Sequence, residues 1–267
     1  SEVARAAEEA GLPVLRRAVA PAPADLEQAA GGRPDLLLVV SFGAILPRAL
    51  LELPSLGAFN LHASLLPRHR GASPVAAAIL AGDRETGLTV QRMVERLDAG
   101  PIVLKRETPI GEGECAGELT ARLAEMGGPL LLEAIDRIVA GRATLLEQDE
   151  SMASLARRLK REDGRIDWRR SAAEVDRHVR AMTPWPGAFT ELDGVEVALL
   201  RGRPEGEAAG AAPGRVLSAG EGGILVACGA GAYRIERLRR AGGREMGAGE
   251  FARGSRLEQG KTLGSPP

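Results

Sequence analysis

The sequence predicts an α/β domain with a doubly wound, mostly parallel sheet, followed by a small antiparallel β-barrel. Three observations lead to this prediction. Short apolar runs alternate with helical segments in the first half of the chain. Short strands separated by glycine turns fill the second half. The 267 residues also exceed one average domain. We place the first domain at 1–140, a linker at 141–159 and the second domain at 160–267.

The amino-acid composition limits the classes of protein to which the chain can belong. Hydrophobic residues make up 44% of the chain and charged residues 27%, and no apolar run approaches the roughly 20 residues that a membrane span needs. These features predict a soluble protein without a membrane partner. The two cysteines, Cys115 and Cys228, lie far apart and have no neighbouring histidine. This predicts neither a disulfide framework nor a zinc site and favours a reducing, cytoplasmic compartment.

The first half can be followed element by element. A polar amphipathic helix opens the chain, and no secretory signal is evident there. Residues 73–83 form a helix that begins with Ser73 as N-cap and Pro74 at its first position and stops at Gly82. The remaining segments have the lengths and patterns of strands or helices. We predict strands at 35–43, 57–64, 86–95 and 100–110 and helices at 45–53 and 117–141.

The pattern changes after the linker. Residues 156–170 read as a basic helix that ends in a turn, and 172–182 as a second helix. A proline-rich turn, "TPWPG", leads to two alternating runs joined at Asp193-Gly194, which is a strong hairpin signal. Strands and glycine turns continue from 214 to 243. These features favour the antiparallel barrel.

Asn60 and His62 are the first candidate functional residues. Side chains alternate along a strand, so Asn60, His62 and Ser64 point the same way at the carboxyl end of the strand 57–64. Open α/β sheets bind ligands at that end. An amide beside an imidazole can stabilise an oxyanion. The alternative is a pair of ordinary polar residues with satisfied hydrogen bonds.

Asp98 is the third candidate. It lies in an Asp-Ala-Gly-Pro turn after an apolar strand, where its carboxylate could simply cap its own turn. Alternatively it holds His62 protonated and accepts a proton from an attacking nucleophile. No Gly-x-Ser-x-Gly segment is present, so the sequence favours direct transfer over a covalent intermediate.

Several long motifs resemble one known family. "NLHASLLPRHRGASP" and "GDRETGLTVQRMVERLDAGPIV" resemble the signature of the folate-dependent formyltransferases. "FGAILP", "QDESMASLARRLKREDGRIDW", "HVRAMTPWPGAFT" and "FARGSRLEQGKTLG" narrow the resemblance to the members that formylate methionyl-tRNA. The resemblance implies a Rossmann-like catalytic domain at 1–140 and an OB-like, tRNA-binding domain at 160–267. It also implies a reaction that needs no metal. Nothing in the sequence demands more than a monomer.

The resemblance also implies roles for individual residues. Asn60 and His62 would polarise the formyl carbonyl of 10-formyltetrahydrofolate, and Asp98 would handle protons. The amine of initiator methionyl-tRNA would then attack the formyl carbon directly. The folate-contacting loop would consist of Ser64, Leu65, Leu66 and Pro67.

Two basic segments agree with a tRNA partner. Residues 157–170 hold seven basic and three acidic residues, and residues 234–244 hold five arginines and one glutamate, so each segment carries a net charge of +4. Ordinary solvated surfaces have such charge as well. The residues that we expect to contact tRNA are Arg68, Arg157, Arg158, Lys160 and Arg161.

Members of this family begin with a strand, a glycine turn and a helix, and the corresponding roughly 30 residues, with a basic loop that grips tRNA, would precede Ser1. Two alternatives to methionyl-tRNA formylation stay open at this point. The same formyl-transfer core resembles that of enzymes with another acceptor amine, namely the sugar-nucleotide formyltransferases and the formyltransferase of the purine pathway. The chain could also be an inactive tRNA-binding module.

Overall fold

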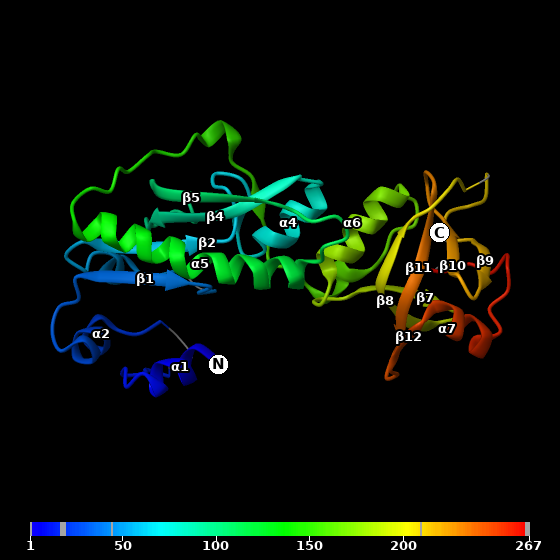
Figure 1. Cartoon of the computed structure of the whole chain (residues 1–267), viewed down its shortest axis with the longest axis horizontal. Coiled ribbons are helices and arrows are strands. Elements are labelled where there is room, and N and C mark those ends of the chain that lie inside the picture. Colours follow the sequence, from blue (N-terminus) through cyan, green and yellow to red (C-terminus); the bar gives the residue numbers. More distant parts are fainter. Residues whose placement is uncertain (1, 17–19, 44, 209, 265–267) are drawn as a thin grey trace. The chain divides into compact units, whose positions relative to one another are not determined.

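The computed structural model describes residues 2–16, 20–43, 45–208 and 210–264 and divides into two units that alternate along the chain (Figure 1). The first unit consists of Ser1–Gly71, Gly87–Glu107 and Ala124–Leu155. The second consists of Ala72–Thr86, Thr108–Leu123 and Ala156–Pro267. The two-residue strands β3 (Arg70–Gly71) and β6 (Leu155–Ala156) lie where the chain passes from the first unit to the second.

A four-stranded sheet organises the first unit. Its strands are β1 (Leu36–Val40), β2 (Gly57–His62), β4 (Glu85–Arg92) and β5 (Ile102–Pro109), in the order β1-β2-β4-β5. The α/β class is confirmed, and β1 runs parallel to β2 as predicted. However, β4 runs antiparallel to β2, so the sheet is mixed where we predicted a mostly parallel one. An apolar strand pattern carries no direction, because direction depends on where the connecting segment re-enters the sheet.

Helices accompany this sheet. They are α1 (Glu2–Glu9), α2 (Pro23–Ala30), the four-residue α3 (Arg48–Leu51) and the long α5 (Ala116–Val139). In Figure 1, α5 runs along the sheet. A Cβ at Gly127 of α5 would lie 2.9 Å from the side chain of Leu61 on β2. The glycine therefore allows this helix and strand to approach closely.

Two helices of the second unit confirm their predicted starts. α4 (Pro74–Ala81) has Ser73 at its N-cap and ends at Gly82, where φ is +75°. α6 (Ala172–Met182) begins with a capping box, in which Ser171 and Glu174 bond each other's backbone N–H. The two helices pack against each other within the second unit.

The predicted basic helix at 156–170 was wrong. The structure has only a 3₁₀ turn there, Arg161–Gly164, after a similar turn at Glu150–Met152 in the first unit. The Asp163 carboxylate accepts hydrogen bonds from the Lys160 backbone N–H and from the Arg157 guanidinium. Such local side-chain bonds compete with helix formation. A Cβ at Gly164 would also meet the Gly187 carbonyl oxygen at 2.0 Å, so this segment is held in contact with the following turn.

A six-stranded antiparallel sheet completes the second unit. The hairpin of β7 (Ala188–Leu192) and β8 (Val195–Pro204) turns at Asp193-Gly194, as predicted, with φ of +50° and +78°. The other elements are β9 (Val216–Gly220), β10 (Gly223–Ala227), β11 (Ala232–Arg240), β12 (Glu245–Gly247) and α7 (Ala248–Ser255).

The strand order is β7-β8-β11-β10-β9, and β12 pairs with β11. Within the described residues β7 and β9 are the two ends of this path, so the predicted barrel is not confirmed. A buried core of Leu199, Ile224, Tyr233 and Leu238 stabilises the sheet. No helix in the described part of the chain is long and apolar enough to cross a membrane.

Candidate active site

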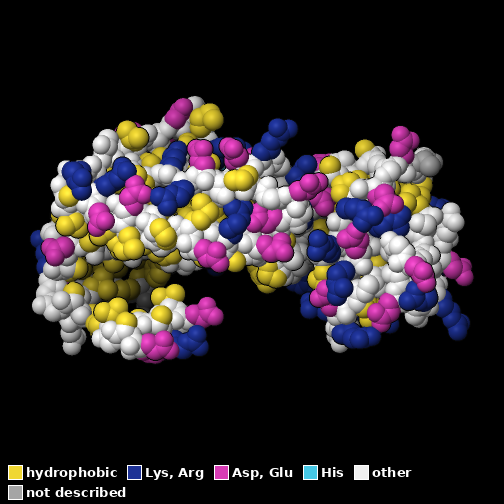
Figure 2. Space-filling view, viewed as in Figure 1, with side chains coloured by type: hydrophobic (Ala, Val, Ile, Leu, Met, Phe, Trp, Pro, Cys, Tyr) yellow, Lys and Arg dark blue, Asp and Glu magenta, His cyan; other side chains and the backbone are white. Residues whose placement is uncertain are grey.

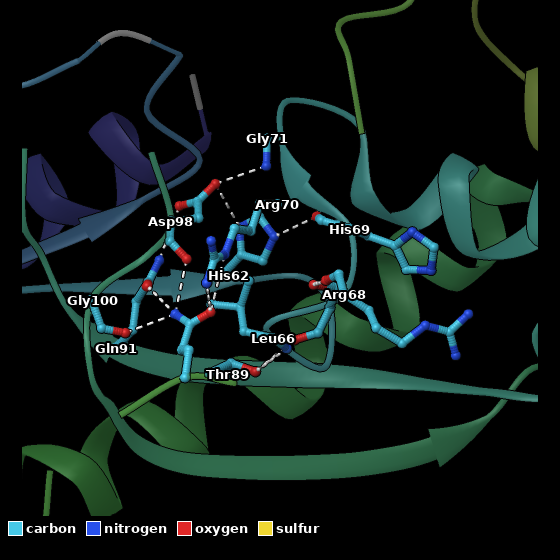
Figure 3. A network of polar contacts seen from close by, with 12 residues as sticks. His62, Leu66, Arg68, His69, Arg70, Gly71, Thr89, Gln91, Asp98 and Gly100 are labelled. Carbon is cyan, nitrogen blue, oxygen red and sulfur yellow. Dashed lines mark hydrogen bonds and ion pairs between the residues drawn. The ribbon is translucent and has the colours of Figure 1, made fainter. Parts of the chain in front are cut away.

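His62 and Asp98 come together in the first unit, 36 positions apart in the sequence (Figure 3). His62 ends β2 and Asp98 lies in the turn between β4 and β5. The Nδ1 atom of His62 lies 3.6 Å from Oδ2 of Asp98, and their side chains are 6% and 12% exposed. On the other edge of the ring, Nε2 lies 3.0 Å from the His69 carbonyl oxygen. The imidazole is therefore held from both sides.

The Asp98 carboxylate is not used to cap its own turn in the described structure. Its Oδ2 accepts a hydrogen bond from the Gly71 backbone N–H at 2.9 Å, and its Oδ1 accepts one from Gln91 Nε2 at 2.9 Å. Asp98 also has a φ of +46°, in the left-handed region where Asn and Asp are the most frequent non-glycine residues. These contacts aim the carboxylate at His62.

Asn60 shares the face of β2 that carries His62, because side chains two positions apart on a strand point the same way. The residue pairs with Val39 on β1 and Gln91 on β4 and is half-buried. In the described part of the chain its side-chain amide has no hydrogen-bond partner. The amide is thus available to a ligand. Ser64 differs, because its fully buried hydroxyl donates to the Arg68 carbonyl oxygen at 2.6 Å.

The predicted folate loop, Ser64 to Pro67, is fixed to β4 by one hydroxyl. The Thr89 side chain donates to the Ser64 carbonyl oxygen at 2.7 Å and accepts from the Leu66 N–H at 3.1 Å. The side chains of Ser64 and Leu66 are fully buried, whereas Leu65 and Pro67 are only half-buried. Any ligand contact of this loop would therefore involve Leu65, Pro67 or the backbone.

The site also contains Arg70, Gln91 and Gln148, and the sequence singled out neither of the two glutamines. All three side chains are buried and form hydrogen bonds around Asp98. A sequence signal did exist at Gln91. It lies two residues after Thr89 on an apolar strand, at a position whose alternation points into the protein. A polar side chain there needs a buried partner.

Glu150 connects this site to the surface. The carboxylate accepts hydrogen bonds from the buried Arg70 guanidinium at 3.0 and 3.1 Å and from the exposed Arg96 at 2.9 Å. These two cations, Arg70 first, lower the pKa of Glu150 to about 2. The buried charge of Arg70 is therefore paired with an ionised carboxylate.

The predicted tRNA-binding cations are mostly paired with acidic residues. Arg157 bonds Asp163, Lys160 lies 3.8 Å from Glu162, and Arg161 bonds Glu196 while stacking 4.3 Å over the Phe189 ring. Basic and acidic side chains are interspersed on the surface (Figure 2). Arg68 and Arg158 are both exposed. Because most of these cations are paired with acidic side chains, the net charge of +4 in residues 157–170 does not form a continuous cationic stripe.

In the second basic segment, residues 234–244, some arginines form ion pairs with acidic side chains and others do not. Arg234 bonds Glu205, Arg237 bonds Glu245, and Arg244 bonds Glu250. Arg239 and Arg240 have no acidic partner among the described residues, and both are exposed. They line a cavity of about 510 Å³ beside Pro184 and Pro186. Trp185, between these two prolines in the sequence, is 59% exposed.

The arrangement around His62 is suited to acyl chemistry. An available amide and an imidazole can donate hydrogen bonds to an oxyanion, and a buried carboxylate beside the imidazole can stabilise its protonated form. Within the described residues no three His, Cys, Asp or Glu side chains lie together in the way that a metal ion requires. The site thus offers hydrogen-bond donors and a proton carrier.

Comparison with known proteins places the chain in a family. Residues 3–135 match the Formyl transferase family and residues 158–256 match the Formyl transferase C-terminal domain. The chain is 43% identical over 258 residues to the methionyl-tRNA formyltransferase of Citrifermentans bemidjiense, covering 97% of this chain and 80% of the relative. It is 44% identical over 268 residues to that of Pseudomonas paraeruginosa, covering 99% of this chain and 85% of the relative.

A solved structure shares the fold. HypX from Aquifex aeolicus, in complex with tetrahydrofolic acid, superimposes with a TM-score of 0.64 at 24% identity. The match covers 86% of this chain but 41% of HypX, so the chain spans less than half of that protein. The two family matches and the 43–44% identity over nearly the whole of this chain are stronger evidence of the family. They show that the chain belongs to the formyl transferase family, among the methionyl-tRNA formyltransferases.

Proposed function

We propose that Asn60, His62 and Asp98 form the centre at which this chain transfers a formyl group from 10-formyltetrahydrofolate to the amino group of initiator methionyl-tRNA. The observation that carries this proposal is the buried His62–Asp98 pair, 3.6 Å apart, beside the available Asn60 amide. Family membership supplies the reaction, and these side chains match what it requires.

The chemistry follows from the positions of donors and acceptors. The amine attacks the formyl carbon, a C–N bond forms, and the carbonyl oxygen becomes an oxyanion to which Asn60 donates a hydrogen bond. His62 donates a second one by exchanging the bond between its Nε2–H and the His69 carbonyl oxygen for one to the oxyanion. The amine loses a proton to the His62–Asp98 pair. The bond between the formyl carbon and the folate nitrogen then breaks, and that nitrogen takes up a proton. The products are formylmethionyl-tRNA and tetrahydrofolate.

The two substrates would use different surfaces. The folate would lie along the loop Ser64, Leu65, Leu66 and Pro67, through the half-buried Leu65 and Pro67 or the backbone. The tRNA would contact the residues predicted from the sequence, Arg68, Arg157, Arg158, Lys160 and Arg161. The unpaired Arg239 and Arg240 beside the cavity in the second unit extend this set. The exposed Trp185 offers a stacking surface nearby in the sequence.

The proposal includes the predicted domain roles. Residues 1–140 would carry catalysis and residues 160–267, as an OB-like domain, would bind tRNA, with 141–159 as the linker. A monomer in the cytoplasm would be sufficient for this reaction, because Asn60, His62 and Asp98 come from one chain.

A transfer assay tests the function. The chain is incubated with 10-formyltetrahydrofolate labelled in the formyl group and with methionyl-tRNA, and label in the aminoacyl-tRNA is measured. The same reaction with an amino-sugar nucleotide as acceptor tests the main alternative. Transfer to methionyl-tRNA alone supports the proposal. Transfer only to the sugar amine contradicts it, and tRNA binding without any transfer favours a tRNA-binding module.

A further inference from the structure

Three buried polar side chains, Arg70, Gln148 and Gln91, lead to the largely buried Asp98 in the first unit (Figure 3). Arg70 donates to Gln148, Gln148 donates to Gln91, and Gln91 donates to Asp98. The residues come from four separate parts of the sequence but lie in one network.

Arg70 determines the orientation of Gln148. A guanidinium is a donor only and stays protonated in proteins. Its Nε and Nη2 lie 3.1 and 2.7 Å from one side-chain atom of Gln148, which must therefore be the acceptor oxygen Oε1. The amide nitrogen of Gln148 then faces the Asp98 carbonyl oxygen at 2.9 Å and the Gly100 carbonyl oxygen at 2.7 Å. Both are acceptors only, so the orientation is fixed at both ends.

Gln148 in turn determines the orientation of Gln91. Its two N–H hydrogens are directed to the carbonyl oxygens of Asp98 and Gly100, and Nε2 lies 3.2 Å from the Gln91 side chain, the longest of its three contacts. An oxygen of Gln91 is favourable beside this nitrogen and an N–H group is not. The Gln91 amide nitrogen is then directed to Asp98 Oδ1, at 2.9 Å. The opposite orientation would place two N–H groups together at Gln148 and two oxygens together at Asp98. Both contacts would be repulsive in a buried site.

At the end of this series of hydrogen bonds, the Asp98 carboxylate accepts hydrogen bonds from N–H donors only. Gln91 donates to Oδ1 and the Gly71 N–H donates to Oδ2. The carboxylate is thus held by one N–H donor at each oxygen, and its Oδ2 faces His62 Nδ1.

We propose that Arg70, Gln148 and Gln91 form a hydrogen-bond relay of fixed direction, which presents Asp98 to His62 as an oriented carboxylate. The three are positioning residues for the reaction, and this inference rests on the proposed function. Glu150 lies outside the relay, because it pairs with Arg70 from the solvent side and is 53% exposed.

A double-mutant cycle tests the direction without a transfer assay. Gln91→Glu keeps the side-chain shape but replaces the donor to Asp98 with an acceptor. Asp98→Asn supplies a donor at Oδ1 and keeps an oxygen for the Gly71 N–H. The double variant restores a donor–acceptor pair, and we expect its Tm to exceed that of Gln91→Glu by about 2–4 °C. A double variant that is unfolded, or that shows only the sum of the two single effects, overturns the proposal.

Steady-state kinetics test whether the relay contributes to formyl transfer. In Gln91→Glu and Gln148→Glu we expect kcat for formyl transfer to fall about 10- to 100-fold, with the KM of both substrates within about threefold. Gln91→Met removes the donor without adding a charge and should lower kcat in the same way in a folded protein. The control Asp193→Asn should keep kcat within about twofold, because this exposed carboxylate of the second unit pairs with Lys261 and touches no residue of the relay.

The outcomes separate the two proposals. If the wild-type chain transfers no formyl group, the proposed function fails, while the double-mutant cycle still measures the relay. If the wild type is active and Gln91→Met and Gln148→Glu keep its kcat, the relay has no role in positioning Asp98 and the inference is overturned.

Discussion

The Nε2 atom of His62 lies 3.0 Å from the carbonyl oxygen of His69. A carbonyl oxygen only accepts, so Nε2 carries a hydrogen and donates it. The Nδ1 edge is the one that faces Asp98, and it is the edge at which the ring can gain or lose a proton. His69 itself has a φ of +58°, which is an uncommon backbone conformation for a non-glycine residue. One residue of the basic loop thus fixes the form of the imidazole on β2.

Asp98→Asn should separate catalysis from folding. Asn accepts the φ of +46° at this position, but its single oxygen cannot serve both the Gly71 N–H and Gln91 Nε2. One buried donor loses its acceptor, so we expect unfolding free energy to fall by about 1–3 kcal/mol. Transfer should fall roughly 100-fold or more, because an amide cannot take up the proton. Urea unfolding and steady-state kinetics measure the two effects.

Asp193→Asn is a matched control for that change. Asp193 also has a positive φ, +50°, but its carboxylate is exposed and pairs with Lys261 at 3.3 Å. Both stability and transfer should stay near wild type, with stability within about 0.5 kcal/mol. Normal turnover in a well-folded Asp98→Asn protein would exclude Asp98 as the proton acceptor.

Asn60→Asp should affect the transition state more than substrate binding. The change keeps the size of the side chain but replaces its only donor with an oxygen. A missing donor to a developing oxyanion costs about 10²- to 10³-fold in kcat. We expect a loss of this size with little change in KM, measured with both substrates varied. An increase in KM at unchanged kcat would instead assign Asn60 to ground-state binding.

The unpaired arginines of β11 should contribute more to tRNA binding than the paired ones. Arg239→Ala with Arg240→Ala removes two exposed cations that have no acidic partner in the described structure. We expect weaker binding of methionyl-tRNA and a salt slope lower by about one for each phosphate that the protein no longer neutralises. Filter binding between about 50 and 200 mM salt measures the slope.

The matched comparison uses arginines from the same segment. Arg237→Ala with Arg244→Ala also removes two charges, but these pair with Glu245 and Glu250. Their removal should leave the salt slope nearly unchanged, since their charges are already compensated. Equal effects of the two double variants would mean that net charge decides binding and that ion pairing is irrelevant.

The lowered pKa of Glu150 predicts that the free energy of unfolding depends on pH. Its pKa is about 2 in the folded protein against an ordinary 4.5, so the folded state holds the proton less tightly than the unfolded state. The resulting stabilisation is complete above the unfolded value and is lost as pH falls from about 4.5 to about 2. In Glu150→Gln this contribution is absent. The difference in unfolding free energy between wild type and variant should therefore be constant near neutral pH and shrink across that window.

Chemical denaturation at several pH values measures this difference. A difference that stays constant down to pH 2 would show that the Arg70 and Arg96 side chains do not favour the ionised form of Glu150. Because the carboxylate is half exposed, added salt should reduce the difference as well.

The local elements and the motif residues could be predicted from the amino-acid sequence. Pro74 and Gly82 delimit α4, and Asp193-Gly194 turns a hairpin, because a proline at a helix start and residues that accept a positive φ act over a few positions. Alternation along one strand was enough to predict a common face for Asn60 and His62. The motif residues also carried the resemblance to the formyltransferases, which the comparisons confirmed.

The tertiary structure determines which of these side chains contact one another. Asp98 could cap its turn or face His62, and the donors from Gly71 and Gln91 select the second arrangement. The direction of β4 and the pairing of each arginine also depend on segments far apart in the chain. Local patterns encode periodicity and caps over a few residues. Hydrogen-bond direction and charge compensation arise between distant segments, so they are settled only when the chain has folded and buried those groups together.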